Sequence, residues 1–153
     1  MKTNRLIKIA VVLIVFITAL GYYAYYEFNR ENDSLKDIQP TFVSSPNTLI
    51  DEFSKNSTSA LQKYVDKVIE IEGQVKNIET TEKNNRTIVL GSENETTSLR
   101  FSLDSMESKK AISIKINSTL RLKGMCTGYN ADEMGLGSDI LFNRAIIVTN
   151  KNN

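Results

Sequence analysis

Hydrophobic and polar residues alternate along five segments of the chain, which is the period of a half-buried β-strand. The predicted strands are 68–78, 87–91, 98–103, 119–129 and 140–149. The first and fourth are long and each contains an internal glycine, Gly73 in "VIEIEGQVKNI" and Gly124 in "LRLKGMCTGY". Because a glycine inside a strand is typical of a bulge or a bend, we interpret these two positions, together with Gly128, as kinks that let a small sheet curl and close.

A helical spacing precedes the first strand. Apolar residues between 49 and 68 recur at intervals of three, four and seven, which places them on one helical face. Ser45 or Asn47 can cap the start, and Pro46 suits a first turn. The sequence "KNSTS" in the middle is poor in strong helix formers and favours a division into two short helices. Another short helix is expected in "DSMESKKAIS", between the third and fourth strands.

These elements together predict an all-β fold with accessory helices. Five strands, a helix between the third and the fourth, and bends in the first and fourth describe the OB-fold, a five-stranded Greek-key barrel. Such barrels bind ligands on the face of strands two and three, between the loop that joins strands one and two and the loop that joins strands four and five.

The first thirty residues have a different pattern. Lys2, Arg5 and Lys8 precede an uncharged run, 9–26. At about 1.5 Å per residue this run crosses most or all of a hydrocarbon core roughly 30 Å thick. Tyrosines at its far end suit the headgroup region, and the basic end is expected in the cytoplasm. We therefore interpret 1–26 as a signal-anchor transmembrane helix with the rest of the chain outside.

A cleaved signal peptide is the alternative, because Ala19-Leu20-Gly21 offers a small-x-small cleavage site. Both routes export the body of the protein. A lipid anchor is excluded because the single cysteine, Cys126, lies far downstream. The predicted organisation is a membrane anchor at 1–26, a polar linker at 27–46, and an OB-fold domain with an N-terminal helix at 47–153.

Four segments carry a family resemblance: "KYVDKVIEIEGQVKNI", "TIVLG", "LRLKGMCTGY" and "LGSDILFNRAIIV". From 48 to 148 the chain resembles the tRNA-anticodon-binding-like OB-fold family of bacterial membrane-anchored proteins and lipoproteins. The join at 63–67 and the run 123–128 are the most specific parts. The resemblance implies an OB-fold body at the bacterial cytoplasmic membrane, facing the periplasm or exterior. Members often place cysteine where this chain has Arg100 and Ala145, so no disulfide or metal role is carried over.

Charge and composition narrow the classes of function. The net charge is +1, and three positive charges precede residue 9, so the remainder carries −2. Such a body lacks the general attraction to nucleic acid that clustered Lys and Arg supply. The chain has no His, and its sequence contains no catalytic carboxylate pair, phosphate-cradling glycine loop or metal-binding cysteine cluster. We therefore expect no enzyme activity, cofactor or metal.

Outward-facing residues of the strands are the candidate ligand-binding residues. Alternation that buries Leu99, Phe101 and Leu122 turns their neighbours outward. The candidates on the strands are Arg100, Arg121, Lys123, Gln74 and Lys76. They form either a solvated strand face or a groove for a phosphate backbone or an acidic partner. Single-strand binders pair such basic residues with exposed aromatic platforms, and the outward positions of strands two and three lack them.

The loop 129–139 adds two groove candidates, Asp132 and Asp139. It is interpreted as a solvated hairpin connection; a cation site is the alternative, although the spacing does not fit the twelve-residue calcium loop. Cys126 lies in a strand with no His to activate it, so burial is favoured over a reactive thiol or an intermolecular bridge.

The favoured hypothesis is a non-enzymatic, membrane-anchored extracytoplasmic binding module that engages a protein or a cell-envelope component. The alternative is a single-stranded nucleic-acid-binding protein at the cell surface, with Arg100, Arg121 and Lys123 as phosphate contacts. A third hypothesis is a structural envelope protein with an inert barrel. The ligand itself does not follow from the sequence.

Overall fold

The computed structural model describes residues 3–28, 35–81, 85–92, 94–131 and 137–149. It divides the chain into two compact units, Met1–Asp33 and Ser34–Asn153. We call the second of these the folded unit.

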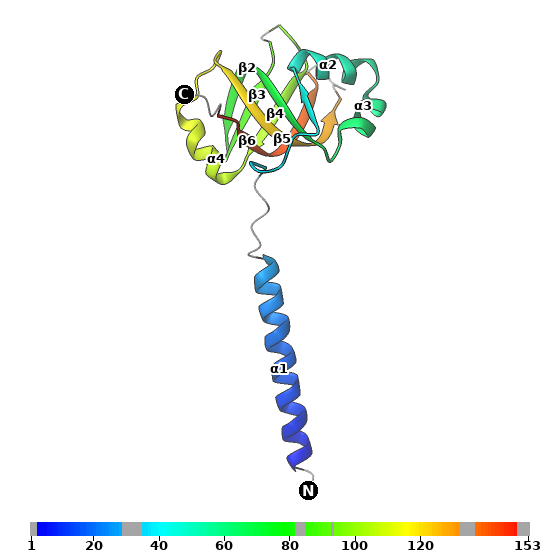
Figure 1. Cartoon of the computed structure of the whole chain (residues 1–153), viewed down its shortest axis with the longest axis vertical. Helices are drawn as coiled ribbons and strands as arrows, with labels where there is room; N and C mark the ends of the chain where they lie inside the picture. Colours follow the sequence, from blue (N-terminus) through cyan, green and yellow to red (C-terminus); the bar gives the residue numbers. More distant parts are fainter. Residues whose placement is uncertain (1–2, 29–34, 82–84, 93, 132–136, 150–153) are drawn as a thin grey trace. The chain divides into compact units, whose positions relative to one another are not determined.

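The first unit contains one helix, α1 (Thr3–Phe28), of 26 residues (Figure 1). In this helix the structure describes the side chains of Lys8 and of 13–25, so part of the predicted span 9–26 lies outside the described side chains. Within the described residues, no helix is both long and apolar enough to cross a membrane.

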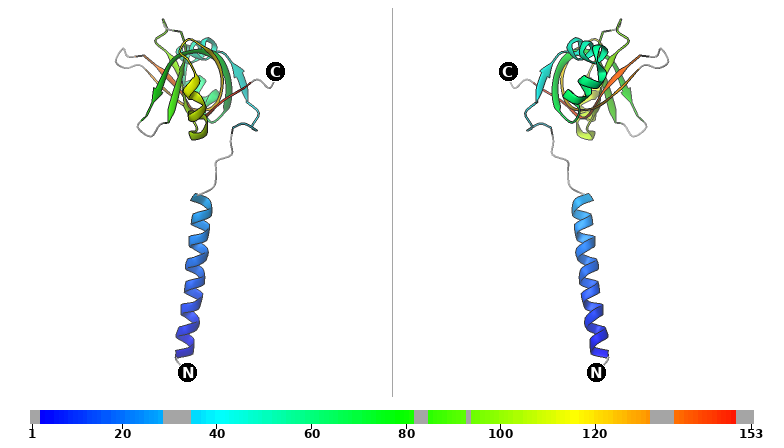
Figure 2. Two further views of the ribbon diagram at one scale, coloured as in Figure 1. Left: turned by 90° about the vertical axis from the view of Figure 1, so that its left-hand side faces the viewer. Right: turned by 90° about the vertical axis from the view of Figure 1, so that its right-hand side faces the viewer.

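The folded unit consists of one sheet and several short helices (Figure 1). In chain order they are β1 (Phe42–Ser44), α2 (Pro46–Lys55), α3 (Ser57–Tyr64), β2 (Val68–Thr80), β3 (Arg86–Leu90), β4 (Ser98–Leu103), α4 (Ser105–Lys110), the 3-10 helix η1 (Ala111–Ser113), β5 (Thr119–Asn130) and β6 (Asp139–Ile147). Along the barrel axis, α4 lies across one end and α2 with α3 across the other (Figure 2).

The sheet closes into a five-stranded barrel. Its strand order is β1-β2-β3-β4-β6-β5, and a further pairing of β2 with β5 closes the circle. The long β2 makes this possible because its first half, to Gln74, pairs with β5 and its second half, from Val75, pairs with β3. Apart from the added β1, the only parallel pair in the closed barrel is β4 with β6. This is the predicted OB-fold, with β1 as an additional strand.

Part of the predicted linker 27–46 packs on the barrel. Leu35 is 1% exposed and packs with Val68 and Ile146, and β1 pairs in parallel with β2. The folded unit therefore includes residues 35–46 of the predicted linker. A single apolar residue in a polar run and a three-residue strand are too short to produce a readable hydrophobic period.

The helix before the first strand is divided in two, as "KNSTS" indicated. Asn56 ends α2 and caps α3, where its side chain accepts a hydrogen bond from Ser59 N at 3.0 Å. At the start of α2 the cap is Ser45, whose hydroxyl accepts from Thr48 N at 3.4 Å, and Pro46 occupies the first turn. Both caps satisfy backbone donors that the helix itself leaves unpaired.

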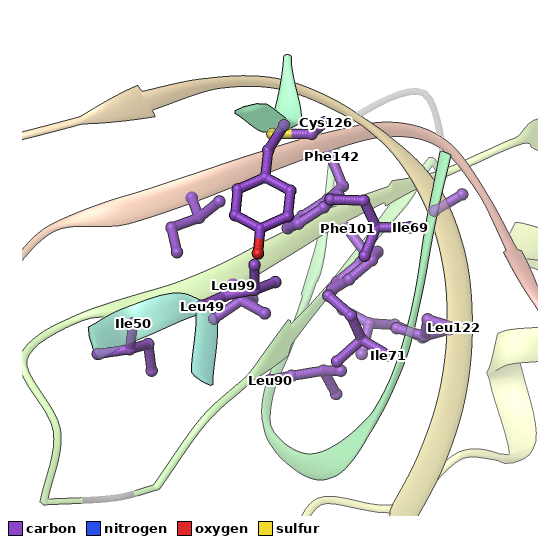
Figure 3. Packing of buried hydrophobic residues seen from close by; sticks show 14 of the residues in the cluster. Leu49, Ile50, Ile69, Ile71, Leu90, Leu99, Phe101, Leu122, Cys126 and Phe142 are labelled. Atoms are coloured by element: carbon purple, nitrogen blue, oxygen red, sulfur yellow. The ribbon is translucent and has the colours of Figure 1, made fainter. Parts of the chain in front are cut away.

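The core fills the barrel and continues under α2 (Figure 3). Inside it, the rings of Phe101 and Phe142 stack with centroids 4.3 Å apart. A Cβ on Gly124 would lie 3.1 Å from Phe142 Cβ and 3.2 Å from the Phe101 ring, and a Cβ on Gly73 would lie 2.5 Å from Pro46 Cγ. Both glycines therefore make room for a close neighbour.

Register shifts accompany the bending of the two long strands. In β5 they fall between Lys123 and Met125 and between Cys126 and Gly128. The shift in β2 falls between Val75 and Asn77, beyond Gly73. At Gly73 the structure shows close packing against Pro46, whereas the break in pairing lies further along the strand.

Candidate ligand groove

A polar groove lies on the outer face of β2, β3 and β4. Val89 of β3 lies at the floor of the groove, between Ile88 and Leu90 of the core; it is itself only 4% exposed and pairs with Arg100 of β4. The hollow above them has a volume of about 280 Å³, close to the lower limit for small-molecule sites. Its lining residues are Lys76, Asn77, Glu79, Val89, Glu95, Thr96, Ser98, Arg100, Gly137 and Asp139.

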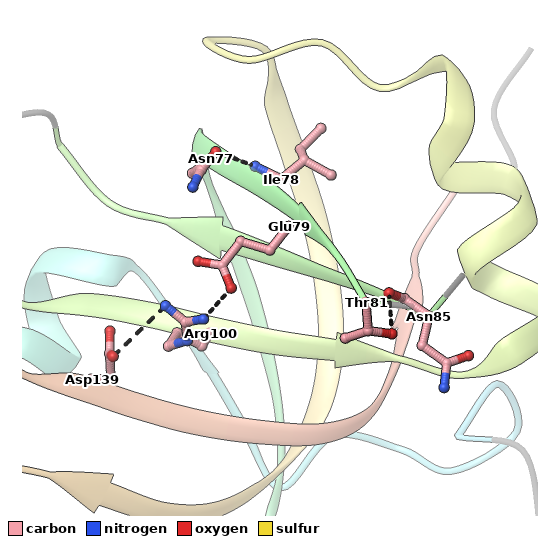
Figure 4. Close-up of polar contacts among 7 residues, drawn as sticks. All are labelled: Asn77, Ile78, Glu79, Thr81, Asn85, Arg100 and Asp139. Carbon is pink, nitrogen blue, oxygen red and sulfur yellow. Dashed lines mark hydrogen bonds and ion pairs between the residues drawn. The ribbon is translucent and has the colours of Figure 1, made fainter. Parts of the chain in front are cut away.

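Arg100 lies at the centre of this groove between two carboxylates (Figure 4). Its guanidinium donates a hydrogen bond to Glu79 of β2, and its Nη1 lies 3.8 Å from Oδ2 of Asp139 at the start of β6. Burial raises the pKa of Asp139, an effect that Arg100 opposes and Glu79 reinforces. The side chains of Arg100 and Asp139 are 30% and 29% exposed, so both can be reached from solvent.

Lys76 fixes the loop between β3 and β4 to one wall of the groove. Its Nζ donates to the carbonyl oxygen of Glu95 at 2.7 Å and to Ser98 Oγ at 3.3 Å. The carboxylate of Glu95 in turn accepts from Ser92 N at 3.3 Å. Lys76 therefore both lines the groove and fixes the backbone of the loop at Glu95 by a hydrogen bond.

Arg121 and Lys123 do not line the groove. Both lie on β5 and pair in register with the first half of β2. Arg121 Nε donates to Glu72 at 2.9 Å, and its Nη1 lies 3.5 Å from Glu70. The structure therefore places the predicted basic residues on two parts of the barrel wall, Arg100 on β4 and Arg121 with Lys123 on β5.

Lys123 is also not exposed. Its side chain turns away from the core as the alternation predicts, yet the residue is 6% exposed. Its Nζ donates to the carbonyl oxygens of Lys36 and Ile38, at 3.1 and 2.9 Å. The segment before β1 covers it, so Lys123 is not available for a phosphate contact.

The remaining predicted site residues, Gln74 and Asp132, are not among those that the structure describes as lining the groove. Gln74 is exposed on β2 and donates to the carbonyl oxygen of Asn117 at 3.4 Å, and it is not among the residues that line the groove. Asp132 lies outside the described residues. The structure thus brings Lys76, Arg100 and Asp139 together in one groove.

Among the described residues that line the groove, none is aromatic. In the folded unit, the aromatic rings that the structure describes pack on one another: Phe42 with Tyr64, Phe53 with Tyr64 and Tyr129, and Phe101 with Phe142. Across the described ranges, no three His, Cys, Asp or Glu residues gather in an arrangement that could hold a metal ion. The groove is therefore a site for polar and ionic contacts.

Comparison with known protein families assigns the chain to one of them. The family model named tRNA_anti-like matches residues 1–139. The chain belongs to the tRNA_anti-like family. None of the curated proteins matches it.

A solved structure has the same fold as this tRNA_anti-like chain. A lipoprotein from Klebsiella pneumoniae subsp. pneumoniae, described as a "putative nucleic acid-binding lipoprotein", superposes with a TM-score of 0.56 at 13% identity, covering 79% of this chain and 100% of its own. The Stn1-Ten1 complex of S. pombe gives a TM-score of 0.35 at 16% identity, covering 53% of this chain and 57% of that chain. The first likeness supports the OB-fold.

Sequence reasoning missed two carboxylates of this tRNA_anti-like domain. Glu79 lies just beyond the predicted strand 68–78, but β2 continues to Thr80 and pairs Glu79 with Thr87. Continued alternation from Asn77 to Glu79 could have indicated this outward position. Glu95 lies in the loop between β3 and β4, where the sequence has no hydrophobic periodicity that could predict its position.

Proposed function

We propose that this protein is a membrane-anchored, extracytoplasmic, non-enzymatic binding module whose groove on β2, β3 and β4 receives a polypeptide segment or another cell-envelope component. The observation that carries this proposal is the charge balance of the groove. Its two cations, Lys76 and Arg100, stand among three carboxylates, Glu79, Glu95 and Asp139. A ligand that offers both donors and acceptors fits such a surface.

A phosphate backbone fits this groove less well. Phosphates bind where free Lys and Arg release counterions, and Arg100 is already held by Glu79 and Asp139. A phosphate placed there would have to displace a carboxylate that remains nearby and repels it. Single-strand binders also gain about 1–3 kcal/mol for each base stacked on an aromatic ring, and the lining residues include none.

The membrane anchor is supported by the character of α1. Large apolar side chains between residues 13 and 25 of this helix are 53% to 74% exposed. They are Leu13, Ile14, Val15, Phe16, Ile17, Leu20, Tyr22, Tyr23 and Tyr25. A helix that is apolar on all sides requires an apolar environment. A lipid bilayer supplies one, and the basic residues at positions 2, 5 and 8 suit the cytoplasmic side.

A single-stranded nucleic-acid binder at the cell surface is the second candidate. The position of the groove favours it, because OB-folds bind oligonucleotides on the face of these same strands. The Klebsiella pneumoniae lipoprotein of similar fold is described as a putative nucleic acid-binding protein, which supports the same candidate.

Two arginines provide a matched test of these candidates. Arg100 and Arg121 are both paired with two carboxylates, but only Arg100 lines the groove. Labelled single-stranded oligonucleotides are titrated with the full chain in detergent micelles, at low and at physiological salt, and fluorescence anisotropy is recorded. The proposed function predicts no saturable binding. Binding that weakens steeply with salt and is lost in Arg100→Glu but kept in Arg121→Glu supports the second candidate.

A photo-crosslinking residue at Asn77, which is exposed and lines the groove, tests the proposed function directly. The full chain carrying it is irradiated in bacterial membranes, and adducts are separated by mass. A discrete polypeptide or glycan adduct that disappears on Arg100→Glu and persists on Arg121→Glu supports the groove as the binding site. Equal adducts in both variants would mean that the groove does not select the ligand.

A further inference from the structure

Exposed large apolar side chains of the folded unit are concentrated between residues 106 and 116. Met106 of α4, Ile112 of η1 and Ile116 beyond it are 66%, 68% and 54% exposed. In the described part of this unit, the other large apolar residues classed as exposed are Ile38 and Val43. Apolar side chains gathered in so short a segment indicate a surface that meets another apolar phase.

Lysines accompany these apolar side chains. Lys109, Lys110 and Lys115 are exposed, whereas Glu107, the only carboxylate between 106 and 116, is 2% exposed. The outward surface of this segment is therefore apolar and cationic. We call it the lysine–apolar patch, and its members are Met106, Lys109, Lys110, Ile112, Lys115 and Ile116.

The patch is held on a fixed base. Glu107 accepts from Ile147 N at 3.3 Å and from Lys110 Nζ at 2.6 Å. Ala111 is fully buried, and its carbonyl oxygen accepts from Arg86 Nη1 at 3.2 Å. Buried contacts thus fix the inner side of α4 and η1, and the apolar and lysine side chains are left on the outer side.

We propose that the lysine–apolar patch docks on the anionic surface of the membrane that anchors the chain. This inference rests on the proposed membrane anchor. Exposed lysines beside exposed apolar side chains match a surface of anionic headgroups over acyl chains, and each lysine near such a surface strengthens binding by about fivefold. An acidic protein surface would match the lysines but leave the three apolar side chains without an equivalent partner.

The position of the patch is compatible with a short tether. Lys36 Nζ lies 3.6 Å from Glu107 Oε1, so the first described residues of the folded unit lie against α4. Any chain of seven residues, the separation of Phe28 from Leu35, spans at most about 25 Å. With α1 as the anchor, the sequence leaves only this length of chain between the anchor and the segment that lies against α4.

The sequence provides a clean probe because it contains no Trp. Met106→Trp places the only indole in the patch, and Val43→Trp places it at a residue of β1 that is 74% exposed. Each full-length variant is reconstituted in vesicles of phosphatidylcholine, with or without phosphatidylglycerol, that contain brominated acyl chains. Quenching of the indole by bromine reports contact with the acyl region, and flotation after carbonate washing reports anchoring.

Docking predicts that the Met106→Trp indole is quenched in the anionic vesicles and the Val43→Trp indole is not. Adding Lys109→Gln and Lys115→Gln, neither of which contacts Glu107 as Lys110 does, lowers the ratio of docked to undocked protein by roughly 25-fold. Equal quenching of the two indoles in a chain that floats with the vesicles overturns docking and leaves the anchor intact. A chain that does not float overturns the anchor and docking together.

Discussion

Lys123 donates a hydrogen bond to the carbonyl oxygen of Ile38 at 2.9 Å, across 85 residues of sequence. The lysine comes from the barrel wall and the carbonyl from the segment before β1, and a second bond reaches the carbonyl oxygen of Lys36 at 3.1 Å. A buried ammonium is stable only when hydrogen bonds replace its lost hydration. The Lys123 ammonium therefore attaches the segment before β1 to the barrel, and the two carbonyl oxygens serve as its hydrogen-bond acceptors.

Lys123→Ala is expected to destabilise the folded unit. Removal of the ammonium leaves two carbonyl oxygens unpaired and opens space under the segment 36–38, at a cost of about 1–3 kcal/mol in the free energy of unfolding. Chemical denaturation of the full chain in micelles measures this. Lys115→Ala is the control, because Lys115 is exposed and a surface change usually alters stability by less than about 0.5 kcal/mol. Equal stability of the two variants would contradict the role of Lys123.

Gly73 and Gly128 are expected to respond oppositely to alanine. A Cβ at Gly73 would lie 2.5 Å from Pro46 Cγ, whereas a Cβ at Gly128 meets nothing within 4 Å. Overpacking predicts a loss of about 1–3 kcal/mol for Gly73→Ala. For Gly128→Ala a small gain of about 0.4–1 kcal/mol is expected, because alanine restricts the unfolded chain. Thermal unfolding of the two variants gives the comparison, and a stabilised Gly73→Ala would disprove the close packing.

Cys126 is expected to be unreactive in the native protein. It is fully buried, and burial raises the pKa of its thiol from 9.0 to about 11, which makes the thiolate about a hundredfold scarcer. Alkylation at neutral pH should therefore be slow in the folded protein and fast after denaturation, as followed by mass spectrometry. Rapid modification of the folded chain would show that the thiol is accessible.

The features of this fold that could be predicted are those that depend on residues close together in the sequence. Alternation is local, so it correctly placed Leu99 and Phe101 inside and Arg100 outside. It could not say what covers an outward residue, which is why Lys123 was assigned to an exposed face. Leu35, which anchors the covering segment, is one apolar residue in a polar run and gives no period.

The groove was predictable in the same limited sense. The OB-fold topology indicated which strands carry it, and Arg100 and Asp139 follow from that topology. The ion pair that neutralises Arg100 in the groove involves Glu79, and the position of Glu79 depends on how far β2 continues before the chain turns. Strand ends are set by tertiary pairing with β3, which a local pattern does not contain.

Glu107 is expected to make stability depend on pH in the acid range. Burial alone would raise its pKa, but Lys110, the backbone N–H of Ile147 and Lys36 together hold the pKa below the ordinary 4.5. A carboxyl whose folded-state pKa is lowered contributes stability above its unfolded pKa and loses it as pH falls through the folded value. Glu107→Gln should therefore destabilise the protein near pH 7 and flatten the decline of stability below about pH 4.5. An unchanged acid profile would assign the decline to other carboxyls.

Arg100→Gln is expected to destabilise the groove in a way that acid relieves. Burial raises the pKa of Asp139, Arg100 opposes this effect, and Glu79 adds to it. Without the arginine the pKa of Asp139 should rise further, since burial and Glu79 would both raise it and Lys76 would be left as the weaker opposing charge. A carboxyl whose folded-state pKa is raised favours the folded state below its unfolded pKa and loses this contribution as pH increases through the folded value.

The stability deficit of Arg100→Gln should consequently be larger at pH 7 than at pH 4. Asp139→Asn removes the titrating group, so Arg100→Gln combined with Asp139→Asn should recover part of the loss at pH 7 and show a flatter pH profile. Arg121→Gln is the matched control, because its carboxylate partners, Glu70 and Glu72, lie outside the groove. Urea unfolding of the four variants at the two pH values tests the coupling. A deficit that is the same at both pH values would mean that Arg100 stabilises the groove by packing and not by holding Asp139 ionised.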